Sequence, residues 1–296
     1  MNRRNFNRKA LALAALAVVP KAGFSQSKKY KIGYQLYSIR DAMAIDPIGT
    51  IKALKAMGYE DFETYGYVPD KDEFYGLKST DFKKTLEDLD LSTTSGHYGF
   101  ADYLDKPSDQ MDRFVDQCIV GAKQVGHKYI TWPVMPTDWR NAESYRKLPA
   151  ILNRVGEQIT KSGLGFAYHN HGYEFQPAGA KTCYDLVLEN TDPSLVKIQL
   201  DMYWVAHSAK RSPSEIIATD PDRFVMWHIK DMDKVTRDYT ELGNGSIDYH
   251  DVLSKASQKG LEYFYIEQGG NYATDSTQSA KDSITYFKKE LKKYLS

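Results

Sequence analysis

The sequence predicts an α/β fold of the (β/α)₈ barrel type, a single domain that follows an N-terminal export signal. Short apolar or β-branched runs alternate with amphipathic segments from residue 30 onward, which indicates parallel strands joined by helical crossovers. Eight such pairs fit within the 296 residues, and about 250 residues is the usual size of such a barrel. An open doubly wound sheet is the rival. It usually carries a Gly-rich loop after its first strand, whereas GYQLYSIRD contains none.

Residues 1–26 have the pattern of an export signal. A basic start, MNRRNFNRK, precedes the apolar run ALALAALAVV and the small and polar residues AGFSQ. The run is too short to span a membrane, which takes about 18 to 20 apolar residues. Arg3 and Arg4 followed by Phe6 resemble a twin-arginine signal, and an ordinary export signal with a basic start is the alternative. Either signal predicts an exported, periplasmic protein that is cleaved near Gln26.

Charge and cysteine content exclude several classes of protein. Without the five basic residues of the first 26 positions, 34 basic and 39 acidic residues remain, a net charge of about −5. A mildly acidic chain without basic clusters argues against a nucleic-acid partner. No other apolar run is long enough to span a membrane. Cys118 and Cys183 lie in helix-like stretches far apart in the sequence, so free buried thiols are expected rather than a disulfide.

The predicted strands are apolar runs that finish in polar residues. Helix-like segments follow at 46–58, 80–90, 109–126 and 145–163, several of which stop at glycine. No linker rich in Pro, Gly or Ser divides the chain, so residues 30–296 are predicted to form one domain. The strand candidates are KIGYQLYS (31–38), DFETYG (61–66), LSTTSGHYG (91–99), KYITWPVM (128–135), GFAYHNH (165–171), VKIQLDMYW (196–204), FVMWHIKD (224–231) and YFYIEQGG (263–270).

Four consecutive strands, the last four of the barrel, each end in a residue that can bind a metal ion. In such barrels the chemistry lies at the carboxyl ends of the strands, and adjacent strands are about 4.8 Å apart. Four neighbouring strand ends can therefore direct four side chains at one ion. Two imidazoles and two carboxylates suit Mn²⁺, Zn²⁺, Co²⁺ or Fe²⁺. The predicted ligands are His169, Asp201, His228 and Glu267.

Each predicted ligand also has a purely structural interpretation. A single histidine at a strand end often makes a hydrogen bond within a loop, and an aspartate there often caps the following helix. The recurrence of metal-binding side chains at the ends of four consecutive strands favours the metal site over these separate explanations.

The motifs YHNHGYEF, QLDMYW, WHIKDMD and YIEQGG follow one another, one per strand. With these motifs the chain resembles the xylose isomerase-like TIM barrels of the sugar phosphate isomerase/epimerase superfamily, over everything after the signal. The resemblance implies a divalent metal ion held by His169, Asp201, His228 and Glu267. There is one departure, since the ketose 3-epimerases of this superfamily carry a glutamate where His169 stands. Proton exchange between two glutamates is therefore not available in its usual form, and the histidine is similar to the inosose dehydratase-type and keto-sugar-processing branches.

The resemblance also implies catalytic roles. A carbonyl and a neighbouring hydroxyl would chelate the ion, which acidifies the adjacent C–H or O–H bond. Glu267 would serve as both ligand and base. His171 and Lys230 each lie two residues beyond a predicted ligand and so project to the same side of the strand. His171 would act as acid or base, or merely orient a partner by a hydrogen bond. Lys230 would stabilise an enediolate or protonate a leaving oxygen, or else form an ion pair with Asp231 or another carboxylate.

The remaining site predictions concern support and substrate contact. Asp231 is predicted to orient His228 through its second ring nitrogen. Residues from the first four strands and the sixth would contact the sugar with polar groups or apolar ring faces, although aromatic residues at a barrel mouth can also be plain packing. These predicted substrate-binding residues are Glu63, His97, Trp132, Tyr34 and Tyr203.

The leading functional hypothesis is a metal-dependent isomerase or epimerase that acts on an unphosphorylated sugar, because an exported protein meets few sugar phosphates and no phosphate cradle is evident. The alternative is a lyase or hydrolase that cleaves keto-sugars or 3-keto-glycosides by β-elimination, after a partner oxidoreductase has made the carbonyl. A third hypothesis is a non-catalytic carbohydrate-binding barrel. An abasic-site endonuclease of the same fold needs further metal ligands and a basic surface, which the sequence lacks.

Overall fold

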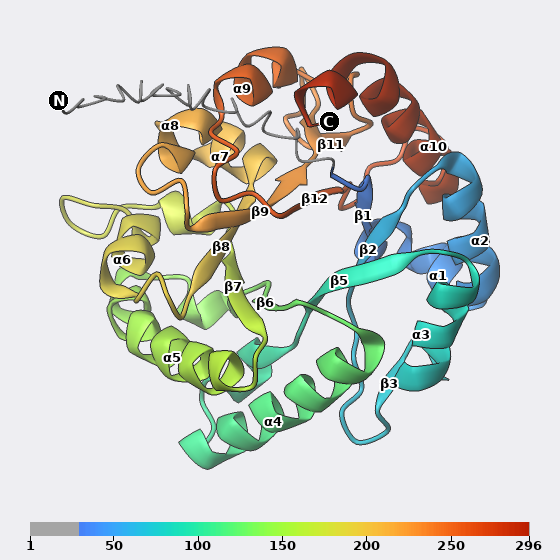
Figure 1. The fold of residues 1–296 in the computed structure, drawn as a ribbon. Helices are drawn as coiled ribbons and strands as arrows, with labels where there is room; N and C mark the ends of the chain where they lie inside the picture. The colour runs from blue at the N-terminus through green and yellow to red at the C-terminus, as the bar shows by residue number, and fades with distance from the viewer. Residues whose placement is uncertain (1–29, 296) are drawn as a thin grey trace, which may run out of the picture.

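The computed structural model describes residues 30–295, which form a closed barrel of eight parallel strands surrounded by helices (Figure 1). Around the barrel the strands follow the order β1-β12-β9-β8-β7-β6-β5-β2. The predicted (β/α)₈ architecture is therefore confirmed. The predicted export signal at 1–26 lies outside the described residues.

Each predicted run contains one barrel strand. Every run extends a few residues past the end of its strand. In the run 196–204 the strand stops at Asp201 and the next residues are helical. The Asp201 side chain accepts a hydrogen bond from the backbone N–H of Trp204 and so starts that helix. The strands are β1 Gly33–Gln35, β2 Asp61–Thr64, β5 Ser92–His97, β6 Tyr129–Trp132, β7 Gly165–His169, β8 Lys197–Asp201, β9 Phe224–Ile229 and β12 Tyr263–Ile266.

The helices surround the barrel. Those that end at Met57 and Val125 are followed by Gly58 and Gly126 in the left-handed conformation, with φ of 102° and 100°, as the glycine stop signal predicts. The helices are α1 Arg40–Ile45, α2 Pro47–Met57, α3 Ser79–Asp88, α4 Ser108–Val125, α5 Ala142–Lys161, α6 Cys183–Asn190, α7 Met202–Ser208, α8 Pro213–Ile217, α9 Tyr249–Lys255 and α10 Ser276–Tyr286.

Short hairpins and 3₁₀ turns, which the sequence did not predict, follow several of the barrel strands. Two antiparallel hairpins, β3 Glu73–Phe74 with β4 Leu77–Lys78 and β10 Asp231–Met232 with β11 Tyr239–Thr240, follow β2 and β9. The second hairpin brings Tyr239 to the site described below. Short 3₁₀ turns follow β1, β5, β6 and β7, the last of them η4 Tyr173–Phe175.

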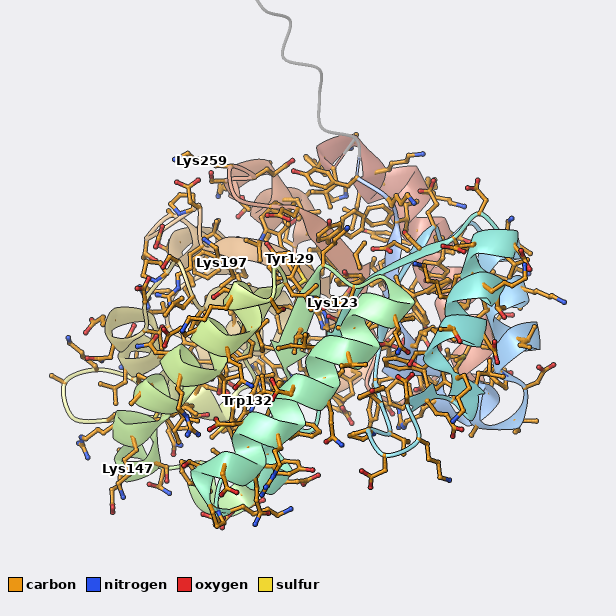
Figure 2. The ribbon with its side chains drawn as sticks, turned by 60° about the horizontal axis from the view of Figure 1, so that its bottom comes forward. Lys123, Tyr129, Trp132, Lys147, Lys197 and Lys259 are labelled. Carbon is orange, nitrogen blue, oxygen red and sulfur yellow. The ribbon has the colours of Figure 1, made fainter. Side chains whose placement is uncertain are left out.

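The main hydrophobic core lies between the barrel and its helices. Trp132 on β6 is buried there, behind the outer helices in Figure 2, whereas Lys123 on α4 and Lys147 on α5 are labelled on those helices. Cys118 and Cys183 are free and buried in this core, as expected. Within residues 30–295 no helix is both long and apolar enough to cross a membrane.

Candidate functional site

The candidate site lies at the carboxyl ends of the strands, inside the barrel. Ala167, Met226 and Tyr265 belong to a small buried apolar cluster within the barrel. Each of these residues precedes a predicted ligand by two positions on β7, β9 or β12. Side chains two apart on a strand share a face, so the predicted ligands form the next layer toward the mouth. Because side chains alternate along the strands, the predicted ligands form a polar layer, called the site layer below, next to the buried apolar cluster.

The four predicted metal ligands converge in this layer. Ligand atoms of Asp201, His228 and Glu267 all lie within 4.8 Å of one another. Nε2 of His169 lies 3.7 Å from Oδ2 of Asp201. All four side chains are buried or nearly so, with Glu267 the most exposed at 9%. These four residues could hold a divalent ion.

His169 is held in the orientation that a ligand needs. The amide nitrogen of Gln199 donates to Glu63 at 2.6 Å, which leaves the amide oxygen of Gln199 to accept from Nδ1 of His169 at 2.9 Å. The proton therefore sits on Nδ1 and the lone pair on Nε2 faces Asp201. Burial lowers the pKa of His169 well below its usual value, and the neighbouring His228 lowers it further. A neutral imidazole with a fixed tautomer is the form that binds metals.

The two carboxylate oxygens of Asp201 make different contacts. Oδ1 accepts the backbone N–H of Trp204 at 3.0 Å and caps α7. Oδ2 is buried, lies 2.7 Å from Nζ of Lys230, and receives no well-directed hydrogen bond among the described residues. The contact with Lys230 is thus ionic and oblique. A buried carboxylate oxygen without a directed partner fits a place for a metal ion.

His228 lies between two carboxylates. Its Nε2 is 2.6 Å from Oε2 of Glu63, and its Nδ1 makes a short contact with Oε2 of Glu267. Burial alone would lower the pKa of His228, but Glu267 and Glu63 raise it to about 9. The His228 ring therefore contacts the buried Glu63 through Nε2 and the predicted metal ligand Glu267 through Nδ1.

Lys230 fills the space between the acidic ligands. Its Nζ lies 2.7 Å from Oδ2 of Asp201 and 3.0 Å from Oε2 of Glu267, and the side chain is 3% exposed. Burial opposes the charge of Lys230, but the two carboxylates raise its pKa above the usual value. Burial would likewise raise the pKa of Glu267, yet Lys230 and His228 lower it well below the ordinary range.

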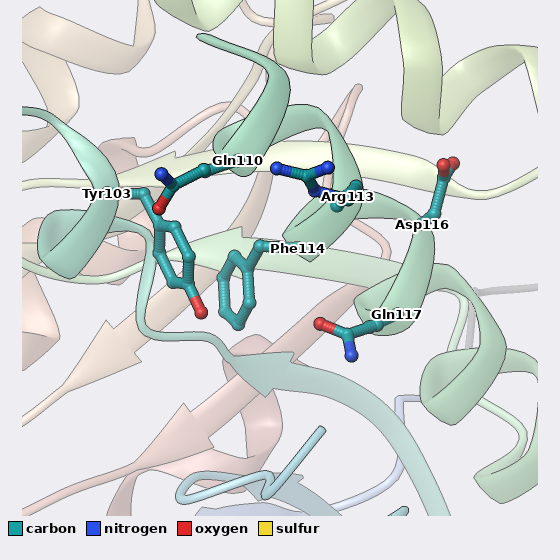
Figure 3. Close-up of a pocket in the computed structure, with 6 residues that line it drawn as sticks. All are labelled: Tyr103, Gln110, Arg113, Phe114, Asp116 and Gln117. Carbon is teal, nitrogen blue, oxygen red and sulfur yellow. The ribbon is translucent and has the colours of Figure 1, made fainter. Parts of the chain in front are cut away.

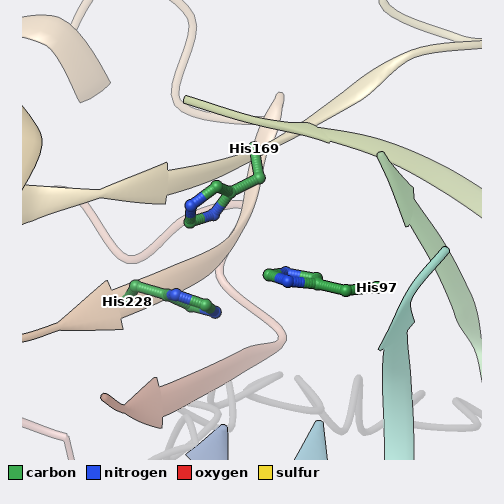
Figure 4. Close-up of side chains that lie close together, drawn as sticks. All are labelled: His97, His169 and His228. Atoms are coloured by element: carbon green, nitrogen blue, oxygen red, sulfur yellow. The ribbon is translucent and has the colours of Figure 1, made fainter. Parts of the chain in front are cut away.

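The imidazole rings of His97, His169 and His228 lie close together inside the barrel (Figure 4). The rings of His97 and His228 are stacked at 5.5 Å, and those of His169 and His228 lie 4.7 Å apart. His97 Nε2 contacts the oxygens of Gln199 at 2.8 Å and Glu63 at 3.1 Å. His97 therefore lies in the same layer of side chains and is only partly buried, and its contact with a substrate stays a prediction.

His171 lies beside His169, with ring centroids 4.9 Å apart. Its ring stacks on Tyr173 at 5.2 Å, and its buried Nδ1 has no hydrogen-bond partner among the described residues. Burial lowers the pKa of His171 to about 3, with a contribution from the charge of Lys230. The ring is thus neutral and has a polar atom free for a ligand.

Glu63 and Asp231 do not have the predicted positions. Glu63 is fully buried and its oxygens contact Gln35, Ser95, Gln199, His97 and His228. It is thereby enclosed by protein rather than open to a sugar. Burial would raise the pKa of Glu63, but the two histidines lower it well below the usual value.

Asp231 was predicted to orient His228, and this was wrong. Its carboxylate accepts the backbone N–H groups of Met232, Gly243, Gly245 and Ile247 instead, at 2.8 to 3.2 Å. It organises the long loop after β9. Glu63 from β2 takes the predicted place beside His228.

The predicted aromatic contacts divide in the same way. Trp132 is fully buried, stacks on Phe100 at 5.0 Å and donates to the carbonyl of Val134, so it packs the core. Tyr34 is 2% exposed and packs on Tyr59 at 4.5 Å. Neither residue is placed to touch a sugar, because each side chain is covered by the shell between the barrel and its helices. Tyr203 is different, since its ring centroid lies 5.9 Å from Nζ of Lys230.

Three further residues of the site region were not predicted. Gln199 precedes Asp201 by two positions on the same strand face, a signal that could have found it. Tyr239 lies 5.5 Å from Nζ of Lys230, but it comes from the β10–β11 hairpin that the sequence did not reveal. Glu174 is fully buried and accepts the backbone N–H of His171 at 2.9 Å.

A separate groove of about 430 Å³ lies along α4 (Figure 3). No residue of the candidate site lines it. Its lining residues are Tyr103, Gln110, Arg113, Phe114, Asp116 and Gln117.

Comparison with solved structures shows the same fold in many proteins. A sugar phosphate isomerase/epimerase from Parabacteroides distasonis is 26% identical, with a TM-score of 0.77 over 90% of this chain and 96% of its own. A zinc-bound structure of the IolI protein is 15% identical, with a TM-score of 0.70 over 90% and 99% of the two chains. The 3-keto-D-glucoside 4-epimerase YcjR from E. coli is 17% identical, with a TM-score of 0.65 over 88% and 100%. No curated protein sequence matched.

The family model described as xylose isomerase-like TIM barrel matches residues 51–290. This span contains seven of the eight barrel strands and all four predicted metal ligands. The chain therefore belongs to the xylose isomerase-like TIM barrel family.

Proposed function

We propose that the protein is a divalent-metal-dependent isomerase or epimerase that acts on an unphosphorylated sugar by removing a proton next to a carbonyl. The observation that carries this proposal is the convergence of Asp201, His228 and Glu267 within 4.8 Å, with Nε2 of His169 3.7 Å from Asp201. Sugar isomerase/epimerase structures among the neighbours support the reaction class.

The donor set fits a divalent cation. His169 offers a lone pair on a neutral ring, and Asp201 offers a buried oxygen that lacks a directed hydrogen bond. Two nitrogen and two oxygen donors suit Mn²⁺, Zn²⁺, Co²⁺ or Fe²⁺. His228, whose pKa the two glutamates raise to about 9, would release its proton as the ion binds. When bound, such an ion supplies Lewis acidity that polarises a sugar carbonyl and acidifies the neighbouring C–H bond.

Glu267 is the proposed base. Lys230 and His228 lower the pKa of Glu267, so its carboxylate is charged but a weak base. Removal of the proton therefore depends on the acidity that a bound metal ion would give to the C–H bond. Its 9% exposure is the largest among the four predicted ligands, so it is the ligand most accessible to solvent. A proton carrier must reach its target within about 3 Å, and Glu267 directly follows the carboxyl end of β12, where barrels of this kind bind their substrates.

Lys230 and His171 are the proposed partners of Glu267. The Lys230 ammonium can stabilise negative charge on a substrate oxygen, since it is charged and its side chain lies beside the rings of Tyr203 and Tyr239 at the carboxyl ends of the strands. The neutral His171 ring offers its unpartnered Nδ1 to a substrate hydroxyl. Glu63 cannot replace the missing second glutamate of the epimerases, because its carboxylate is enclosed by protein partners.

Solvent exchange tests the proposal. The protein loaded with Mn²⁺ and incubated with ketoses in deuterated water should place deuterium on the carbon next to the carbonyl. Glu267→Gln should lower that rate by more than about 100-fold, in the range of other lost acid–base groups. Glu262→Gln is the matched control because Glu262 contacts Tyr129 and lies outside the site layer. Exchange that survives removal of the metal would contradict the proposal.

A lyase or hydrolase that cleaves 3-keto-glycosides is the second candidate. It is favoured by His169, which replaces the glutamate that would carry a proton on the opposite face of the sugar. One base, Glu267, with a nearby acid, Lys230, suffices for β-elimination. Incubation with a 3-keto-glycoside separates the candidates, since elimination releases the aglycone whereas isomerisation leaves the glycoside intact and deuterated. This candidate also requires a partner oxidoreductase that supplies the keto group.

The cellular setting belongs to the same proposal. The predicted export signal would direct the mature protein to the periplasm, where an enzyme meets few sugar phosphates. Fractionation of cells that express the full chain tests this, with the mature protein expected in the periplasmic fraction. A substrate screen that pairs each sugar with its phosphate ester tests the preference for the unphosphorylated form.

A further inference from the structure

We infer that the ammonium of Lys230 occupies the metal position in the metal-free protein and that binding of a divalent ion moves it onto the ring faces of Tyr203 and Tyr239. This inference rests on the proposed function, because it concerns the same metal site. It predicts that a residue of the chain itself competes with the ion for the site.

The distances make the two cations mutually exclusive. Nζ of Lys230 lies 2.7 Å from Asp201 and 3.0 Å from Glu267. A divalent ion bound to these oxygens would lie about 2.0 to 2.2 Å from each. Both cations would then share one small buried space, where their repulsion is strong. The ammonium must therefore leave when the ion enters.

The present contact is not an ideal one for Lys230. The Asp201 oxygen that faces Nζ receives no well-directed hydrogen bond, although the two atoms are 2.7 Å apart. The ammonium thus balances the charge of this oxygen without a well-directed hydrogen bond to it. The oxygen therefore loses no directed hydrogen bond when a metal ion takes the place of the ammonium.

Two tyrosine rings next to the predicted metal ligands can receive the displaced ammonium. Nζ of Lys230 is 5.9 Å from the ring centroid of Tyr203 and 5.5 Å from that of Tyr239. Aromatic faces attract cations within about 6 Å. The two rings lie 4.9 Å apart, on α7 and on the β10–β11 hairpin. Together they form a surface that a small rotation of the lysine side chain can reach.

The movement is confined to the side chain. The hydroxyl of Tyr249 accepts the backbone N–H of Lys230 at 3.0 Å and lies 2.6 Å from its backbone carbonyl. This clamp holds the main chain at the end of β9. Metal binding would then move the ammonium from the carboxylates of Asp201 and Glu267 to the ring faces of Tyr203 and Tyr239.

Calorimetric titration with Mn²⁺ tests the inference. Lys230→Met should bind Mn²⁺ at least tenfold more tightly than the wild type, because the competing cation is gone. Its melting temperature without metal should be lower, and the rise on adding Mn²⁺ should be larger. Lys255→Met, which removes an exposed lysine paired with Asp251 on α9, should leave Mn²⁺ affinity unchanged.

A second pair of variants keeps the test independent of Lys230→Met. Tyr239→Leu removes an aromatic face and should weaken Mn²⁺ binding several-fold, whereas Tyr239→Phe keeps the face and should bind as the wild type does. Equal or weaker Mn²⁺ binding by Lys230→Met would overturn the inference and leave the proposed metal site intact. Binding by Lys230→Met but not by the wild type would support the inference and overturn the metal dependence of the proposed function.

Discussion

Asp201 and Lys230 meet in the barrel mouth, where Oδ2 of the carboxylate lies 2.7 Å from Nζ of the ammonium. The other oxygen of Asp201 accepts the backbone N–H of Trp204 and starts α7. The structural and the functional interpretation of a strand-terminal aspartate are therefore compatible. One oxygen serves the fold, and the other is left for the site.

This division allows the two roles of Asp201 to be separated by mutation. Asparagine caps helices as well as aspartate does, so Asp201→Asn keeps the cap of α7. It leaves the buried Lys230 with Glu267 as its remaining carboxylate partner, and should therefore lower the free energy of unfolding of the metal-free protein by about 3 to 5 kcal/mol. It should weaken Mn²⁺ binding by more than about 100-fold, since loss of even a supporting partner costs 10- to 100-fold. Urea denaturation and calorimetric titration measure the two effects.

Asp248→Asn is the matched control. Asp248 caps α9 by accepting the backbone N–H of Asp251 at 3.0 Å and takes no part in the site layer. Asp248 is exposed and has no buried ion pair among the described residues, so its variant should have little effect on stability and no effect on Mn²⁺ affinity. Undiminished Mn²⁺ affinity in Asp201→Asn would remove Asp201 from the ligand set.

The fold could be predicted from the sequence because apolar runs and amphipathic helical segments alternate along the chain, and each can be recognised from neighbouring residues alone. Each apolar run contains one barrel strand, and side chains two apart on a strand share a face, so the convergence of His169, Asp201, His228 and Glu267 follows from their positions at consecutive strand ends. The sequence could not reveal which side chains those residues contact across the barrel. The contact of His228 with Glu63 joins residues 165 positions apart.

Glu63 is expected to support the metal site through His228. A carboxylate on the second ring nitrogen fixes the tautomer of a ligating histidine. Glu63→Gln should therefore weaken Mn²⁺ binding by about 10- to 100-fold, which calorimetric titration would measure. Asp231→Asn should leave Mn²⁺ affinity unchanged and lower stability instead, because Asp231 holds backbone N–H groups of the loop after β9. The reverse pattern would restore the role first predicted for Asp231.

Aromatic residues were the least predictable part of the site. Trp132 and Tyr34 lie near strand ends, yet both side chains point into the shell between the barrel and its helices. Period-two alternation distinguishes the two faces of a strand, but both faces of a barrel strand are buried. Tyr239 was missed for another reason, since its short hairpin leaves no run long enough to read.

Trp132 is accordingly expected to affect stability rather than substrate binding. Trp132→Phe should lower the free energy of unfolding by about 1 to 3 kcal/mol through lost packing on Phe100. The KM of the folded protein for its sugar should stay unchanged. Tyr239→Leu should raise KM several-fold, because Tyr239 lies beside Lys230 at the mouth. Steady-state kinetics with denaturation curves of both variants test the contrast, and a raised KM for Trp132→Phe would contradict it.

Asp61 predicts a dependence of stability on pH that is separate from the site. Its carboxylate on β2 is buried and accepts hydroxyl hydrogen bonds from Ser92 and Thr94. Burial raises the pKa of Asp61 from 3.8 to about 6, against the effect of these hydrogen bonds. The folded state therefore holds a proton that the unfolded chain has already released between about pH 4 and 6. Stability from this residue is greatest below pH 4 and is lost as the pH rises to 6.

Asp61→Asn tests this directly, since the amide has no proton to lose. The free energy of unfolding of the wild type relative to Asp61→Asn should fall by up to about 3 kcal/mol between pH 4 and 6 and then stay constant, at about 1.4 kcal/mol for each unit of pKa. Urea denaturation at several pH values measures the difference, in which the other titrating groups cancel. Asp282→Asn, which alters an exposed carboxylate on α10, should show no such slope. A difference that is flat with pH for Asp61→Asn would mean that Asp61 is charged in the fold.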